Sequence, residues 1–164
     1  MYDFNAEEIF KIAMRIEENG AAFYRKAADL QADAENKKLL LQLAVMEDGH
    51  KASFRKMSKD VTAAQKAEQV FDPNGEGAQY LAAMVDSHGG EGSPSAADKL
   101  TGKESMEEIL TTAIGLEKES ILFYLGIKDL VPPKLGRDKV DAIINEERKH
   151  VIQLNTLLGK IKGK

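Results

Sequence analysis

Apolar residues recur every three or four positions along two long stretches of the chain, which is the spacing of one face of an α-helix. In the first stretch they include Ile9, Ala13 and Ile16. A further run of this kind predicts a second helix over about residues 36–59. The first half of the chain is therefore expected to form a helical hairpin over about residues 5–59.

The second stretch repeats the first at an offset of 100 residues, without gaps. The sequence NAEEIFKIAMRIEENGAAFY of residues 5–24 aligns with SMEEILTTAIGLEKESILFY of residues 105–124. A repeat at a fixed offset predicts two structural units of the same kind. A second helical hairpin is therefore expected over about residues 105–158.

Both halves begin with the spacing of a capping box, in which a polar N-cap residue and a glutamate three positions later satisfy free backbone amides. The two capping boxes are Asn5-x-x-Glu8 and Ser105-x-x-Glu108. They predict that the first helix of each hairpin begins close to these residues.

In the second hairpin, Pro132 and Pro133 cannot continue a helix, so they are expected to lie between its two helices. Asp138 is expected to cap the following helix, because aspartate is a preferred N-cap residue. Gly159 is expected to end this helix after about residue 158, because glycine commonly follows the last helical turn.

Residues 60–104 join the two hairpins and contain the loop-like sequences FDPNGEG and SHGGEGSPSAADKLTGKE, with AQYLAAMVD between them as a short helix candidate. An up-down-down-up bundle needs a long crossover to place its second hairpin beside the first, and this segment is long enough to supply it. Its Gly and Ser content also suits a domain boundary. Each hairpin alone is too small to bury its apolar face, which favours one domain over residues 1–164. The predicted fold is all-α, a four-helix bundle with a long crossover between helices 2 and 3.

Six ionisable residues interrupt the apolar faces of these four helices. The offset of 100 residues relates them in pairs, and the pairs are Glu17 with Glu117, Glu47 with Glu147, and His50 with His150. In each Glu-x-x-His the two side chains project from the same side of the helix, one turn apart. The four apolar faces meet in the core of a bundle, so all six groups are expected to lie there together.

Buried carboxylates protonate, form ion pairs or bind a metal, and these apolar faces contain no Lys or Arg. Two divalent cations would balance four carboxylates, and two imidazoles would complete their coordination. A single Glu-x-x-His is usually a surface pair, but two at the repeat offset, each with a matching glutamate, favour a dinuclear metal site. The oxygen and nitrogen ligands suit iron or manganese and do not decide between them.

Other polar groups near these positions have plainer interpretations. Tyr24 and Tyr124 are either core aromatics or hydrogen-bond donors to the ligating carboxylates, and the sequence leaves both alternatives open. Glu18, Glu119 and Glu146 adjoin the candidate ligands but point away on the helical wheel, so we expect them on the solvated surface. His88 lies in a Gly-rich segment without other ligands and is expected to be solvated.

The composition of the chain argues against disulfides, nucleic-acid binding and a membrane span. The chain contains no cysteine, which excludes disulfides and any cysteine-ligated iron within it. The formal net charge of −4 provides no basic surface for nucleic acid. No apolar run is long enough for a membrane span and the N-terminus does not read as a signal peptide, so a cytoplasmic location is expected.

The two halves resemble the rubrerythrin-like branch of the ferritin-like superfamily. The resemblance rests on AMRIEENGAAFY with EDGH and on AIGLEKESILFY with ERKH, and it spans both hairpins. It implies a non-haem di-iron centre, the two Glu-x-x-His glutamates being the expected bridging pair. The ligands that it implies are Glu17, Glu47, His50, Glu117, Glu147 and His150.

The resemblance implies an oxidoreductase of the peroxidase or ferroxidase type, which reduces hydrogen peroxide or dioxygen in oxidative stress. The alternatives are an iron-binding protein for sequestration or delivery, and a metal-stabilised structural dimer. Two departures from rubrerythrins matter. The cysteine-ligated rubredoxin-like domain is missing, so we expect a separate donor such as a rubredoxin. Ser120 stands where rubrerythrins have a further glutamate, one turn after the third-helix ligand, and Gly20 stands at the pseudo-symmetric position. A homodimer is also expected.

Overall fold

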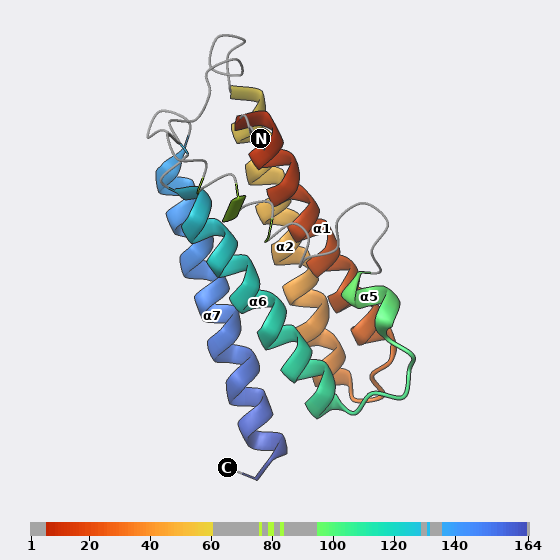
Figure 1. The fold of residues 1–164 in the computed structure, drawn as a ribbon. Coiled ribbons are helices and arrows are strands. Elements are labelled where there is room, and N and C mark those ends of the chain that lie inside the picture. Colours follow the sequence, from red (N-terminus) through yellow and green to blue (C-terminus); the bar gives the residue numbers. More distant parts are fainter. Residues whose placement is uncertain are drawn as a thin grey trace.

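Four long helices form an antiparallel bundle in the computed structural model, which describes residues 6–60, 76, 79–80, 83, 95–128, 131 and 136–163 (Figure 1). The helices are α1 (Ala6–Asp29), α2 (Ala34–Asp60), α6 (Met106–Lys128) and α7 (Arg137–Ile161), and a short helix α5 (Ala96–Lys99) precedes α6. No strand occurs among these residues. The predicted all-α bundle and its long crossover between the second and third long helices are confirmed.

The helices pair as the sequence repeat predicts. Helix α1 packs along α2 and α6 packs along α7, while α1 also contacts α6 and α2 contacts α7. In Figure 1, α1 and α7 run in one direction, and α2 and α6 run in the other. The crossover makes this order possible, because it returns the chain to the end of the bundle from which α6 starts.

The beginning of α6 follows the predicted capping box. The backbone N–H of Glu108 donates to Ser105 Oγ at 3.2 Å, and the backbone N–H of Ser105 donates to Glu108 Oε2 at 2.8 Å. The equivalent pair, Asn5 and Glu8, cannot be assessed, because Asn5 and the side chain of Glu8 lie outside the described part of the chain.

Both predicted ends of α7 were wrong. The N-cap residue is Gly136, whose φ of 106° is left-handed, and its carbonyl accepts from Lys139 and Val140 without any side-chain cap. Asp138 therefore lies inside the first turn. At the other end the helix continues through Gly159 to Ile161. A helical glycine costs only about 1 kcal/mol relative to alanine, which packing of the last turns against the core can offset.

The crossover contains one element that was expected to be loop. Ser95 and Asp98 form a capping box that begins α5, and Ala97 and Leu100 are buried against α1 and α6 residues. In the candidate segment AQYLAAMVD the described residues, 79–80 and 83, are helical. Pro132, Pro133 and His88 lie outside the described residues.

The core consists of two apolar clusters with the ionisable residues between them. One cluster contains Phe10, Phe54 and Ile127, and the other contains Phe23 and Leu110. Along each long helix, the candidate metal ligands lie between residues of the first cluster and residues of the second. The bundle thus encloses a polar layer between two apolar ones.

No described helix is long and apolar enough to cross a membrane.

Candidate metal centre

All four long helices contribute to the polar layer in the core. Glu17 comes from α1 and Glu117 from α6, whereas α2 and α7 each supply a glutamate and, one turn later, a histidine. The six residues are 0–4% exposed, and they are Glu17, Glu47, His50, Glu117, Glu147 and His150. The structure therefore brings together the complete set of residues that the sequence singled out.

Glu147 and Glu47 each reach both histidines. Glu147 Oε1 lies 2.9 Å from His50 Nδ1, and its Oε2 lies 3.0 Å from His150 Nδ1. Glu47 mirrors this arrangement at 3.4 Å, with Oε2 toward His50 and Oε1 toward His150. The two carboxylates of the Glu-x-x-His motifs therefore occupy the centre of the cluster, between the two imidazoles.

The other two glutamates each adjoin one histidine. Glu17 Oε2 lies 3.2 Å from His50 Nδ1, and Glu117 Oε2 lies 3.3 Å from His150 Nδ1. The cluster thus divides into two groups of four residues, and Glu47 and Glu147 belong to both groups. Within each group the four possible ligand atoms lie within 4.8 Å of one another. Two metal ions with two common carboxylates require this division.

Two tyrosines link the hairpins at the outer side of the cluster. Tyr24 of α1 donates its hydroxyl hydrogen to Glu117 Oε1, and Tyr124 of α6 donates to Glu17 Oε1. Both rings are 0–1% exposed. Of the two alternatives left open by the sequence, the structure shows the hydrogen bonds to candidate ligands.

Burial and mutual charge divide the four carboxyl groups into two kinds. Burial raises the pKa of Glu117 to about 8 and also raises the pKa of Glu17. Burial opposes ionisation of Glu47 and Glu147 too, but the two adjacent imidazoles outweigh it and lower both pKa values. The central pair is therefore held ionised while the outer pair tends to be protonated.

The histidines respond in the opposite sense. Burial favours the neutral imidazole, but the surrounding carboxylates outweigh burial and raise the pKa of both His50 and His150. Without metal, two imidazolium ions and two ionised carboxylates therefore leave the core near neutrality. Divalent cations would replace these protons as the balancing positive charge.

The residues present fit a dinuclear metal site. Both carboxylate oxygens of Glu147 are buried, and apart from their ion-pair contacts with the two histidines they have no hydrogen-bond partner among the described residues. Such orphaned anionic oxygens are costly unless a cation satisfies them. The complete donor set is four carboxylates and two imidazoles, which suits divalent iron or manganese.

One neighbouring residue was predicted incorrectly. Glu146 was expected to be solvated, yet its Oε2 lies 2.8 Å from His50 Nε2, with the carboxylate side chain 44% exposed. The helical wheel of α7 points Glu146 away from the α7 ligands, but it points toward the adjacent α2. Packing between hairpins decides this contact. Glu18 and Glu119 are exposed as predicted.

The two small residues beside the cluster differ in their surroundings. A Cβ atom on Gly20 would lie 3.5 Å from Glu47 Cγ, so this glycine lies against one of the central carboxylates. Ser120 is partly buried, and its hydroxyl donates to the carbonyl of Leu116 at 3.1 Å. A Cβ at position 20 would therefore already touch Glu47, and a longer side chain there would have to displace it.

Comparisons with known proteins agree with this geometry. The sequence model of the Rubrerythrin family matches residues 1–71. The fold matches a crystal structure from Thermotoga maritima assigned as a ferritin-like diiron-carboxylate protein, with 27% identity and a TM-score of 0.75, over 100% of this chain and 99% of the other. No curated protein sequence matches the chain. These findings confirm the predicted resemblance: the chain is similar to rubrerythrins over its first 71 residues and to a ferritin-like diiron-carboxylate protein over its whole length.

Proposed function

We propose that this protein is a non-haem di-iron oxidoreductase that reduces hydrogen peroxide or dioxygen. The observation that carries the proposal is the pair of four-residue donor groups that share Glu47 and Glu147. Two carboxylates common to both groups would hold two metal ions close enough to act on one small oxidant. The similarity to a ferritin-like diiron-carboxylate protein supports iron as the metal.

The proposed chemistry needs two electrons at one place. Reduction of hydrogen peroxide to two water molecules consumes two electrons and two protons, and a pair of ferrous ions supplies the two electrons. Glu17 and Glu117 would each bind one ion together with one histidine, while Glu47 and Glu147 would bind both. Four carboxylates balance the charge of two divalent ions, and the apolar clusters on both sides limit access of water.

The tyrosines have a positioning role in this proposal. Each hydroxyl donates to the outer oxygen of a terminal glutamate, which leaves the other oxygen, Oε2, directed toward a histidine Nδ1. Tyr24 and Tyr124 thereby orient Glu117 and Glu17 for binding. Carboxylates that bind a metal are usually fixed by hydrogen bonds from such outer partners.

We also propose the partners that the sequence predicted. The chain contains no cysteine, so a separate protein such as a rubredoxin would supply electrons to it.

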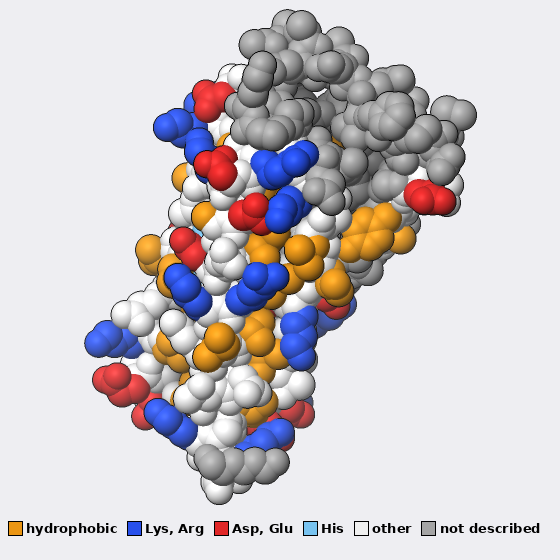
Figure 2. Space-filling model, turned by 90° about the vertical axis from the view of Figure 1, so that its left-hand side faces the viewer, with side chains coloured by type: hydrophobic (Ala, Val, Ile, Leu, Met, Phe, Trp, Pro, Cys, Tyr) orange, Lys and Arg blue, Asp and Glu red, His pale blue; other side chains and the backbone are white. Residues whose placement is uncertain are grey.

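A homodimer is proposed because Val45 and Ile152 are 66% and 65% exposed, and Figure 2 shows apolar side chains along the middle of one face, between lysines and arginines. Light scattering combined with size-exclusion chromatography tests the dimer.

Stopped-flow mixing of the anaerobic ferrous protein with hydrogen peroxide, and separately with dioxygen, tests the activity. The expected result is rapid iron oxidation that continues over many turnovers when a reductant is present. Slow oxidation that stops after one equivalent would contradict the enzyme and support the alternative, iron sequestration or delivery. Glu18→Gln is a matched control, because Glu18 is exposed and its carboxylate pairs with Lys51 Nζ at 3.0 Å.

A further inference from the structure

The two histidines of the centre differ at their outer nitrogens. His50 Nε2 lies 2.8 Å from Glu146 Oε2. His150 Nε2 is buried and has no hydrogen-bond partner among the residues that the structure describes. The candidate ligands are therefore arranged nearly symmetrically, but the partners of the two histidine Nε2 atoms differ.

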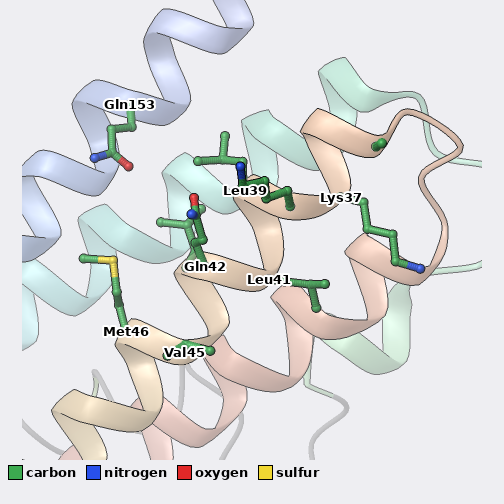
Figure 3. Close-up of a pocket in the computed structure, with 10 residues that line it drawn as sticks. Lys37, Leu39, Leu41, Gln42, Val45, Met46 and Gln153 are labelled. Carbon is green, nitrogen blue, oxygen red and sulfur yellow. The ribbon is translucent and has the colours of Figure 1, made fainter.

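The sequence repeat explains the difference. At the offset of 100 residues, the position equivalent to Glu146 is Met46. A carboxylate is a strong acceptor, whereas the thioether of methionine is a weak one. Met46 on α2 and Gln153 on α7 line a surface groove of about 740 Å³ (Figure 3). The position equivalent to Glu146 therefore lines a mostly apolar groove and offers no carboxylate.

This difference bears on metal binding because of the direction of each imidazole. The Nδ1 atoms of His50 and His150 face the carboxylates, so Nδ1 is the nitrogen available to a metal. A neutral ring that binds metal through Nδ1 carries its proton on Nε2. An acceptor at Nε2 fixes this tautomer and ring orientation and makes the ligating nitrogen more basic. Among the described residues, such an acceptor is present for His50 and absent for His150.

We propose that the two halves of the centre bind metal unequally, with the Glu17–His50 half filling first and the Glu117–His150 half binding more weakly and exchanging faster. Glu146 is the positioning residue that creates this order, and Met46 stands at the repeat-equivalent position, where it offers no carboxylate. The proposal rests on the dinuclear centre proposed above.

Anaerobic titration with Mn²⁺ and anomalous diffraction from crystals that contain one equivalent test the proposal. In the wild-type protein we expect the anomalous signal at the Glu17–His50 half. Loss of an outer hydrogen-bond partner typically weakens metal binding by about 10- to 100-fold, so the second step should be weaker by about that factor. The double variant M46E/E146M should reverse the order of filling.

Controls separate this proposal from the proposed function. Glu18→Gln removes an exposed carboxylate beside a candidate ligand and should leave the order unchanged. Absence of bound Mn²⁺ in every protein would overturn the dinuclear centre itself. Two bound ions with equal occupancy at one equivalent in the wild type would overturn only the inequality. The wild-type crystals decide this even if the double variant fails to fold.

Discussion

Tyr24 donates its hydroxyl hydrogen to Glu117, a residue of the other hairpin, and Tyr124 donates to Glu17 in return. These two hydrogen bonds connect the halves of the repeat across the bundle. Each tyrosine is buried and lies 93 or 107 positions from its partner, so the contact depends on the folded arrangement of α1 and α6.

Replacing either tyrosine by phenylalanine should destabilise the protein. The substitution removes the hydroxyl without changing the size of the ring. A buried glutamate then lacks its hydrogen-bond donor, and such a loss typically lowers the free energy of unfolding by about 1–3 kcal/mol. Urea unfolding of the metal-free Tyr24→Phe and Tyr124→Phe variants measures this loss. Tyr80→Phe is the matched control, because Tyr80 is 38% exposed and water can replace its bond to the carbonyl of Leu122. Equal stability of all three variants would contradict a role for the buried bonds.

The metal-free protein should lose stability as the pH rises from about 5 to 8. Burial raises the pKa of Glu117 from 4.5 to about 8, so the folded state holds a proton over this interval that the unfolded chain has released. The raised pKa values of the histidines act in the same direction above pH 6.5. The contribution of Glu117 and the two histidines to the free energy of unfolding is therefore full at low pH and is lost as the pH rises.

Thermal or urea unfolding at several pH values, with metal removed by a chelator, checks the pH dependence. The variant Glu117→Gln cannot titrate and should show a smaller decrease between pH 5 and 8. A steeper decrease in this variant would contradict the assignment. In the presence of Mn²⁺ the trend should reverse, because binding displaces protons and so strengthens as the pH rises.

How far the sequence predicts this molecule depends on the kind of contact. The repeat and its helical periodicity predict the four long helices, their pairing and the six residues of the cluster, because these depend on which face of a helix is apolar. The ends of α7 could not be predicted from residue preferences, since the left-handed Gly136 begins the helix before Asp138. Local preferences compete with each other at a helix end, and the tertiary structure decides between them.

The contact of Glu146 with His50 shows the same limit within the site. A helical wheel compares directions on one helix, whereas this bond joins α7 to α2. A signal was present in the sequence, because Glu146 precedes a candidate ligand and is charged where its repeat partner, Met46, is apolar. The packing of α7 against α2 is needed to show that Glu146 contacts His50.

Small residues beside the cluster should matter for the oxidant more than for the fold. Ser120→Leu fills the space where rubrerythrins use a further glutamate, and it should slow the reaction of the ferrous protein with peroxide. Unchanged reactivity would argue against access on this side. Stopped-flow absorbance measures the rate, and metal content of the same sample shows that the centre is still loaded.

Gly20 provides the complementary test on α1. A Cβ at this position would make ordinary contact with Glu47, so Gly20→Ala should keep the metal content and gain up to about 1 kcal/mol from helix propensity. The larger Gly20→Leu should displace the Glu47 carboxylate and lower the metal content. Urea unfolding and metal analysis distinguish the two variants, and equal metal content in both would contradict this placement of Glu47.

If the buried glutamates and histidines form a dinuclear metal centre, protein purified without chelators under iron-replete conditions should contain two metal ions per chain. Glu147→Ala removes a carboxylate that lies between both histidines and should lower this number, whereas Glu18→Gln should not. Metal analysis of the purified proteins measures the content. Less than one metal ion per wild-type chain would rule out the dinuclear centre.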